Sequence, residues 1–300
     1  MRSSLSLKSL AGLGTIAVMC AGLGAGCATS TASHRSHPGA PTGVRGPFAV
    51  DMPWEVLGES REARPVRAKS IPGSGMNTFS PRRAALIAGI HGDEREGGRH
   101  LAELQSLLES SNFVVRVYED VNPDGTWRNA RTTVKGVDPN RNWPAKNFKA
   151  SRQTGPEPLS EPGVAAVHGD LVNFDPEIVI VLHSTRRGPF ANFDGPAEAL
   201  AERFAEAAGE PWTVQPSMGY PTPGSLGSWM GVDRQVPILT IEFQRGCSEE
   251  LSRPAVLAGV AAVLGCMAPS TLVPSTLVPS TLAPRPSTLS QGTNPEFRVN

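Results

Sequence analysis

The chain has 300 residues, of which 39% are hydrophobic and 19% are charged, and this composition is typical of a globular protein with an apolar core. Lys plus Arg and Asp plus Glu both number 28, so the formal net charge is zero and no basic excess indicates a nucleic-acid partner. The length allows one large domain or two small ones.

The first 27 residues have the pattern of an export signal. Arg2 and Lys8 supply a positive start, and residues 10–26 are uncharged but too short and glycine-rich for a good spanning helix. Small residues before Cys27 resemble the bacterial lipobox, in which the cysteine is lipidated. We therefore expect an exported, membrane-anchored lipoprotein that faces the periplasm or the cell exterior, with plain secretion as the alternative.

Two other segments differ in composition from the middle of the chain. Residues 28–47 are rich in Ser, Thr, Gly, Pro and Ala, as in a flexible tether. Residues 268–300 repeat Pro-Ser-Thr-Leu, and regular prolines oppose helices and sheets, so we expect a disordered or extended tail. The folded domain is expected over residues 48–267. There Cys247 and Cys266 either form a disulfide, which export permits, or are two core thiols.

Within residues 48–267, short apolar runs alternate with helical patterns. The apolar runs predict strands over residues 84–90, 113–118, 178–182 and 236–243. Helical spacing of Leu101, Leu104 and Leu108 predicts one helix, and further helices are expected over residues 163–172, 196–208 and 251–264. Continuous apolar strands flanked by helices predict an α/β fold, with a mixed, largely parallel central sheet and helices on both faces.

Three polar residues lie at the ends of predicted strands. His91 follows the first strand, His183 follows residues 178–182, and Glu242 lies near the end of the last strand. Active sites of such sheets form at the carboxyl ends of the strands, which is a structural reason to group these residues.

The segment His91-Gly92-Asp93-Glu94 places a histidine and a glutamate three residues apart just after a strand. Through one tight turn both can bind the same ion, and a catalytic zinc site uses three protein ligands, His₂Glu among the known sets. His183 is a suitable third ligand. The alternatives are a surface salt bridge at His91 and a hydrogen-bonded core histidine at His183.

A polar segment follows the strand over residues 113–118. Asn122-Pro123-Asp124-Gly125 is a turn signature, and Arg131 and the segment Asp138-Pro139-Asn140-Arg141-Asn142-Trp143 come after it. Arginine binds carboxylates in bidentate pairs and stabilises oxyanions, two functions needed to cleave a bond next to a free carboxylate. The alternative is an ordinary polar loop.

Glu242 lies within the apolar run Ile238-Leu239-Thr240-Ile241-Glu242-Phe243. A buried carboxylate is costly unless it is paired or near a metal, and burial raises its pKa toward the range useful for proton transfer. We expect a general base; the alternative is a glutamate that faces solvent on an alternating strand.

Together these motifs resemble the M14 zinc carboxypeptidase family over roughly residues 84–242 and in the family's order. The resemblance implies a bound Zn²⁺ held by His91, Glu94 and His183, with Glu242 as the catalytic base. The implied ligands form a His₂Glu set, in which an open position remains for water.

The same resemblance implies the residues that contact the substrate. Arg131, in preference to Arg128, matches the arginine that polarises the scissile carbonyl. Asn140 and Arg141 match the pair that binds the substrate's carboxylate, and Tyr220 matches the family's mobile tyrosine.

Residues 219–229 look most similar to the murein peptide amidases of that family, which cleave the γ-D-glutamyl–diaminopimelate bond of cell-wall peptides. Pro139 and Gln244-Arg245 depart from the family's usual pattern, and Gly227 matches a position that often sets specificity. We expect zinc-dependent hydrolysis of such a bond in muropeptides. The alternatives are a general metallocarboxypeptidase, a metal-dependent deacylase of N-acyl amino acids and a non-catalytic wall-binding lipoprotein.

Overall fold

The computed structural model describes residues 53–216 and 218–267. The expected signal over residues 1–27 with Cys27, the tether over residues 28–47 and the tail over residues 268–300 lie outside the described residues. Within the described ranges, no helix has the length and apolar character needed to cross a bilayer.

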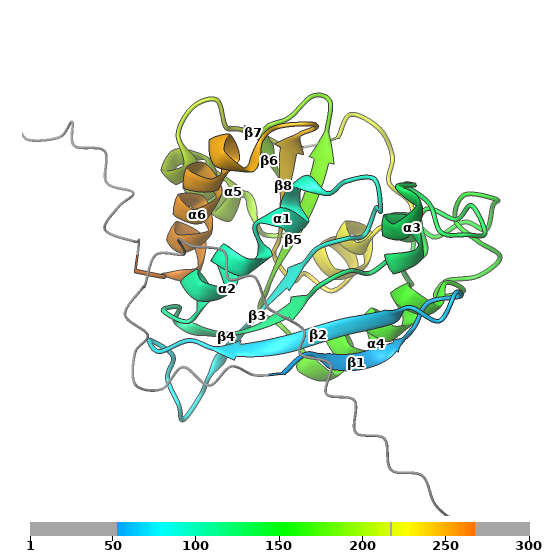
Figure 1. The fold of residues 1–300 in the computed structure, drawn as a ribbon, viewed down its shortest axis with the longest axis horizontal. Coiled ribbons are helices and arrows are strands. Elements are labelled where there is room, and N and C mark those ends of the chain that lie inside the picture. Colours follow the sequence, from blue (N-terminus) through cyan, green and yellow to red (C-terminus); the bar gives the residue numbers. More distant parts are fainter. Residues whose placement is uncertain (1–52, 217, 268–300) are drawn as a thin grey trace, which may run out of the picture. The chain divides into compact units, whose positions relative to one another are not determined.

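The described residues form one mixed sheet with the strand order β1-β2-β4-β3-β5-β8-β6-β7 (Figure 1). Its strands are β1 (Glu55–Glu59), β2 (Pro65–Pro72), β3 (Arg82–Ile87), β4 (Phe113–Tyr118), β5 (Ile178–Thr185), β6 (Phe190–Asp194), β7 (Thr213–Gln215) and β8 (Ile238–Gln244). The central strands β4, β3, β5 and β8 are parallel. On one side of them, β2 pairs antiparallel with β4 and β1 pairs antiparallel with β2, and on the other side β6 pairs antiparallel with β8. The predicted mixed, largely parallel sheet is confirmed.

Helices cover both faces of this sheet (Figure 1). The helical elements are α1 (Glu96–Arg99), α2 (Leu101–Leu108), α3 (Pro123–Arg128), η1 (Pro139–Arg141), α4 (Pro162–Phe174), α5 (Glu198–Ala208), the π-helical η2 (Gly227–Asp233) and α6 (Glu249–Leu264). Helices α2, α5 and α6 pack on one face, and α4 with η2 packs on the other.

Strand β5 shows why the central strands are apolar throughout. Ile178, Ile180 and Leu182 belong to the core under α2, α5 and α6, while Val179 and Val181 belong to the core under α4. Because successive side chains of a strand point to opposite faces, a strand between two helical layers must be apolar at every position.

Strand β3 ends earlier than predicted, at Ile87 rather than residue 90. Gly89 has a φ of +67°, which breaks the strand and turns the chain toward His91. The predicted strand over residues 113–118 has the observed bounds of β4. Helix α5 begins at Glu198 rather than residue 196, and Gly209 is its C-cap residue.

Strands β1, β2, β6 and β7 are not among the strands that the sequence predicts. They lie outside the parallel centre, where one face or edge tolerates polar residues. In β2, for example, Arg67 and Lys69 interrupt the apolar pattern, and Pro65 and Pro72 stand at both ends. Pairing with β4, which the local sequence does not encode, defines this strand.

The segment Asn122-Pro123-Asp124-Gly125 is the start of helix α3 and not the isolated turn that its composition predicts. The Asn122 side chain accepts a hydrogen bond from the Gly125 N–H at 3.1 Å, and Pro123 occupies the first turn. Both are preferred at a helix start, because they leave few N–H groups without partners.

Cys247 and Cys266 are free thiols, and both pack against the core under α2, α5 and α6. Of the two alternatives for this pair, the structure therefore has the core thiols.

Candidate active site and metal centre

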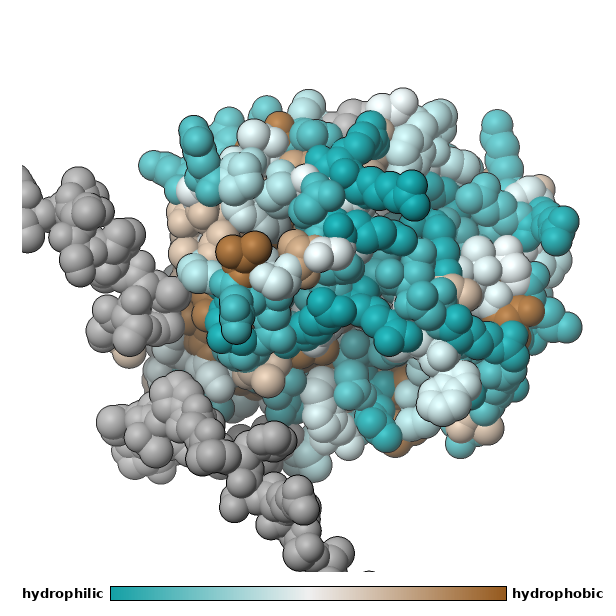
Figure 2. Space-filling view, turned by 45° about the horizontal axis from the view of Figure 1, so that its top comes forward, coloured by the Kyte–Doolittle hydropathy of each residue, from teal (hydrophilic) through white to brown (hydrophobic). Residues whose placement is uncertain are grey.

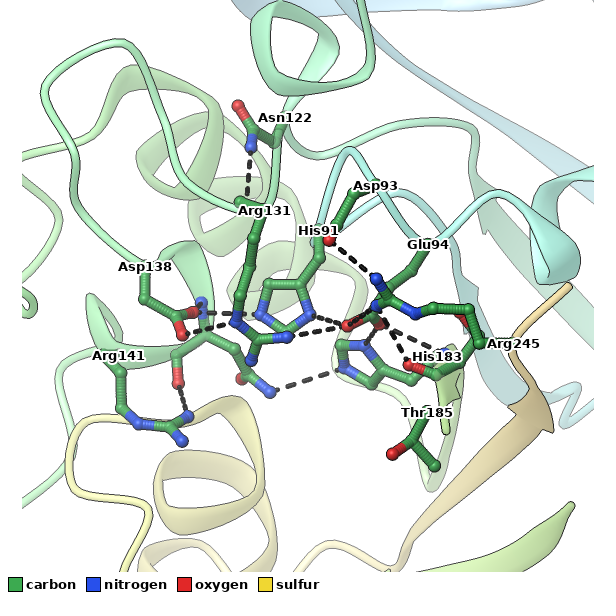
Figure 3. Close-up of polar contacts among 12 residues, drawn as sticks. His91, Asp93, Glu94, Asn122, Arg131, Asp138, Arg141, His183, Thr185 and Arg245 are labelled. Atoms are coloured by element: carbon green, nitrogen blue, oxygen red, sulfur yellow. Dashed lines mark hydrogen bonds and ion pairs between the residues drawn. The ribbon is translucent and has the colours of Figure 1, made fainter. Parts of the chain in front are cut away.

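His91, Glu94 and His183 meet at the carboxyl ends of β3 and β5 (Figure 3). One donor atom from each lies within 4.8 Å of the other two, and all three side chains are buried. The imidazole rings of His91 and His183 are 4.7 Å apart between their centroids. The structure thus brings together the three residues that the sequence singles out as ligands.

A tight turn holds the first two of these residues in place. The Glu94 N–H donates to the His91 carbonyl at 3.2 Å, which folds the glutamate back beside the histidine. Gly92 lies so close to the start of α3 that a Cβ there would be 2.0 Å from the carbonyl carbon of Gly125. Only glycine therefore fits at position 92.

The donor set suits zinc. His91 Nδ1 is buried and has no hydrogen-bond partner, although it lies 3.0 Å from Glu94 Oε1, and His183 Nδ1 lies 2.7 Å from Glu94 Oε2. An unpartnered buried nitrogen beside a carboxylate and a second imidazole is the arrangement of a His₂Glu zinc site with room for a further ligand.

Asp138 lies behind His91 at the candidate metal centre. Its Oδ1 accepts a hydrogen bond from His91 Nε2 at 3.0 Å, so that Nδ1 faces the other ligands. Burial by itself raises the pKa of Asp138, but His91 and Arg131 outweigh that effect and hold the pKa well below its usual range. A charged carboxylate behind a ligating histidine orients the ring and increases its basicity. In the sequence Asp138 is one of several residues of a polar segment, and nothing there indicates this role.

The Glu94 carboxyl is also held in its charged form. Burial again raises its pKa, but the charge and hydrogen bond of His183 and the hydrogen bond of His91 hold the pKa far below the ordinary glutamate value. The Ser184 N–H donates to Glu94 Oε2 at 3.1 Å. Glu94 is therefore an ionised oxygen donor, which is the form that binds a metal ion.

Glu242 lies on β8 directly opposite His183 on β5. Its side chain is buried, and burial raises the pKa of its carboxyl above the ordinary value. Among the described residues, no hydrogen bond is recorded for this carboxylate, which lines the same cavity as the metal ligands. An unpaired buried carboxylate with a raised pKa is suited to accept a proton.

Arg131 reaches the candidate metal ligands from the segment after α3. Its Nη1 donates to Glu94 Oε1 at 2.7 Å, and its Nε donates to Asp138 Oδ2 at 3.2 Å. Arg128, the second candidate, instead pairs with Glu62. Of the two arginines, the structure therefore places Arg131 at the site.

Asn140 and Arg141 belong to η1, whose first turn is capped by the Asp138 side chain. Asn140 Oδ1 accepts from the Leu226 N–H at 3.0 Å, and Asn140 Nδ2 lies 3.4 Å from His183 Nε2. The buried Arg141 guanidinium donates to the Asn140 carbonyl at 2.6 Å. The Asn140 amide oxygen is thus occupied, whereas one hydrogen of its NH₂ group and the remaining Arg141 donors are left for a ligand.

These side chains line a cavity of about 640 Å³. Tyr220 lies on its wall with nearly half of its surface exposed. Arg186, Arg187 and Arg245 also line it, and Figure 3 shows Arg245 across the metal ligands from Arg141.

Asp194, the last residue of β6, also lines the cavity and is a residue that reasoning from the sequence misses. Burial raises the pKa of its carboxyl, and no hydrogen bond or ion pair is recorded for it among the described residues. A Cβ at Gly227 would be 2.0 Å from Asp194 Oδ2, so the glycine makes room for this carboxylate. Nothing near Asp194 in the sequence indicates this, because Gly227 is brought to it only by the fold.

His100 and His168, to which the sequence assigns no function, have structural roles. His100 Nε2 lies 2.9 Å from Ser252 Oγ, and its ring stacks on Phe243. His168 packs against Trp229. Neither histidine lines the cavity of the metal ligands.

Comparisons with known proteins agree with this geometry. Residues 52–195 match a family profile described as zinc carboxypeptidase. Murein peptide amidase A of Escherichia coli strain K12 is 33% identical over 190 residues, which cover 58% of this chain and 76% of the amidase.

Solved structures with a similar fold include the murein-tripeptide amidase MpaA of Escherichia coli O157. It matches with a TM-score of 0.55 and 28% identity over 70% of this chain and 90% of that chain. Thrombin activatable fibrinolysis inhibitor matches with a TM-score of 0.60 and 20% identity over 71% of this chain and 68% of that one, and so shares the fold.

Proposed function

This chain belongs to the M14 zinc carboxypeptidase family and is a zinc metallopeptidase, and we propose that it hydrolyses the γ-D-glutamyl–diaminopimelate bond of murein peptides. The relatives named murein peptide amidase support this substrate class. The observation that carries the proposal is that Arg141 and Asp194 both line the same cavity.

Diaminopimelate has a carboxylate next to the scissile nitrogen and a second amino-acid group at its far end. The Arg141 fork, with the Asn140 NH₂ group, binds the near carboxylate, because a guanidinium pairs with a carboxylate through two parallel hydrogen bonds. Asp194 faces the cavity with no recorded cation beside it among the described residues, and an unpaired carboxylate that is partly buried loses part of its hydration without compensation. The ammonium group of diaminopimelate offsets that cost by pairing with the carboxylate. A leaving residue that carries no positive charge leaves the carboxylate unpaired.

His91, Glu94 and His183 would hold zinc, which when bound supplies Lewis acidity that polarises the scissile carbonyl and lowers the pKa of water. Glu242 removes a proton from the attacking water and returns it to the leaving amine, since its raised pKa favours both transfers.

Arg131 stabilises the negative charge that develops on the carbonyl oxygen. Its guanidinium already lies at the ligands, 2.7 Å from Glu94 Oε1, and 40% of its side chain is exposed, so that it can turn toward a substrate. Tyr220, which is also partly exposed, closes over the substrate from the cavity wall.

The test is mass spectrometry of products after incubation of the zinc-loaded protein with murein tripeptide and with peptides that end in single L-amino acids. We expect release of diaminopimelate from the tripeptide, and an Asp194→Asn variant should lose most of that activity. Faster release of Phe, Leu, Lys or Arg from ordinary peptides would instead identify a general carboxypeptidase. Cleavage of N-acyl amino acids alone would identify a deacylase.

We further propose that the protein is exported and anchored to a membrane through a lipid on Cys27, facing the periplasm or the cell exterior. The positive start, the uncharged stretch and the small residues before Cys27 support this proposal. The native protein should partition into detergent, and Cys27→Ser should release it, because several acyl chains hold a protein firmly. A mature N-terminus at another residue without lipid would contradict the anchor.

A further inference from the structure

We propose that Arg245, assisted by Arg186, binds the free carboxylate of the glutamyl residue on the acyl side of the scissile bond and so selects acidic, γ-linked substrates. This inference rests on the proposed murein substrate. Arg245 belongs to the Gln244-Arg245 segment that departs from the family's usual pattern, and Arg186 lies three residues after His183. The inference assigns a ligand to both arginines.

The backbone holds Arg245 at the edge of the catalytic centre. Its N–H donates to the Thr185 carbonyl at 2.8 Å, which joins the end of β8 to the end of β5. The next N–H, of Gly246, donates to the buried Glu96 Oε1 at 2.7 Å. Arg245 therefore lies three residues after Glu242, in the turn directly after β8 that these two hydrogen bonds hold in place.

The guanidinium lies on the opposite side of the metal ligands from Arg141. Figure 3 shows Asp138 and Arg141 on one side of the imidazole rings, and Arg245 with Asp93 on the other. The scissile carbonyl must lie between Arg141 and Arg245, beside Glu242 and the metal ligands. Because Arg141 binds the carboxylate of the leaving residue, Arg245 faces the acyl residue.

Arg245 is oriented but keeps donors for a ligand. Its Nη1 donates to Asp93 Oδ2 at 2.8 Å, and its Nη2 makes long contacts of 3.4 Å to Glu94 Oε1 and 3.5 Å to the Ser184 carbonyl. Its side chain is 32% exposed. A guanidinium has five N–H donors, and Nε has no hydrogen bond recorded among the described residues. Asp93, Glu94 and the Ser184 carbonyl thus orient the guanidinium, while its Nε–H is left for a ligand.

Arg186 adds a second positive charge at the same place. Its carbonyl accepts from Gln244 Nε2 at 3.3 Å, so it is adjacent to Arg245 across the ends of β5 and β8. Its side chain is exposed, lines the cavity and has no recorded partner in the part of the chain that the structure describes. Figure 2, turned so that the top of Figure 1 comes forward, shows mainly hydrophilic residues on this face, which suits a charged ligand.

The chemistry of the substrate matches this placement. In a γ-linked glutamyl residue, four C–C bonds separate the carbon of the free α-carboxylate from the scissile carbonyl carbon. With bonds of about 1.5 Å, these two carbons are roughly 5 Å apart when the chain is extended. A guanidinium on the acyl side of the metal ligands can therefore form hydrogen bonds with a carboxylate at that distance from the scissile carbonyl. An acyl residue with an uncharged side chain offers no such partner.

The experiment measures kcat/KM of the full-length, zinc-loaded protein on two synthetic peptides, L-Ala-γ-D-Glu-diaminopimelate and its analogue with D-isoglutamine, in which a carboxamide replaces the α-carboxylate. The parent should prefer the acid by about 10- to 100-fold, the effect of a hydrogen bond to a charged group. Arg245→Gln should abolish most of that preference by lowering kcat/KM for the acid alone, and Arg186→Gln should reduce it by less.

Arg234→Gln is the matched control, because Arg234 has a similar exposure of 36% but does not line the cavity. It should leave the preference unchanged. Zinc content is measured for each variant, since Arg245 also contacts Asp93 and Glu94.

Equal loss on both peptides in Arg245→Gln, with zinc retained, would overturn the inference and give Arg245 a purely structural role. A parent enzyme that cleaves both peptides equally well would overturn it too, while leaving the murein substrate in place. A parent that cleaves neither peptide would remove the proposed function, and the inference with it.

Discussion

Replacing Asp138 by asparagine tests whether the carboxylate behind His91 supports the metal centre. Asp138 Oδ1 accepts from His91 Nε2 at 3.0 Å and from the Asn140 N–H at 2.8 Å, and Oδ2 accepts from Arg131 Nε at 3.2 Å. Every partner is a donor. The NH₂ group of an asparagine must therefore face another donor in either orientation, and the negative charge is lost as well.

Substitutions of such outer partners lower metal affinity by roughly 10- to 100-fold, or about 1.4–2.8 kcal/mol. We expect Asp138→Asn to weaken zinc binding by this amount. The assay is competition with a chromophoric chelator at fixed pH, with circular dichroism to verify that the zinc-free variant is folded. A matched control is Asp175→Asn, which removes an exposed ion pair with Arg83 outside the cavity.

The control should bind zinc as tightly as the parent. A folded Asp138→Asn variant with unchanged zinc affinity would refute the argument that this carboxylate orients and charges the site through His91. The η1 cap can be kept by the asparagine oxygen, because Asn and Asp cap a helix start about equally well. The melting temperature of the zinc-free protein measures any change in stability separately from zinc binding.

Four further substitutions test the remaining parts of the site. His183→Ala should lose most of the bound zinc, measured by metal analysis after dialysis, and full retention would remove His183 from the ligands. Glu242→Gln should keep zinc but lose roughly 10²–10⁴-fold in turnover. Because burial raises the pKa of Glu242 and the base acts when ionised, activity of the parent should fall as the pH drops through a pKa above the ordinary glutamate value. Arg141→Lys should lower kcat/KM, since an ammonium cannot replace the planar fork, and unchanged kcat/KM would exclude the bidentate clamp. Gly92→Ala should impair zinc binding, because its Cβ would meet the Gly125 backbone at 2.0 Å; a zinc affinity equal to the parent's would show that the turn can relax.

The sequence by itself indicated the centre of the fold because the physical cause there is local. The apolar residues 178–182 must be covered on both faces, which predicts a strand between two layers of helices. The strands outside this parallel centre could not be predicted in this way. β2 contains Arg67 and Lys69 and is defined by its pairing with β4, a distant partner in the chain.

The site divides along the same line. His91 and Glu94 are three residues apart on one turn, so the sequence alone shows that they can bind one ion, and the motif order indicated His183 and Glu242 as their partners. The environment of the metal depends on the tertiary structure. Asp194 has its place because Gly227, far away in the chain, leaves it space, and Arg245 faces the cavity because β5 and β8 end side by side. Metal ligation needs particular residue types at a short spacing, which a sequence records directly, whereas the charge and shape of a cavity arise from close approaches between distant segments, which only the folded chain determines.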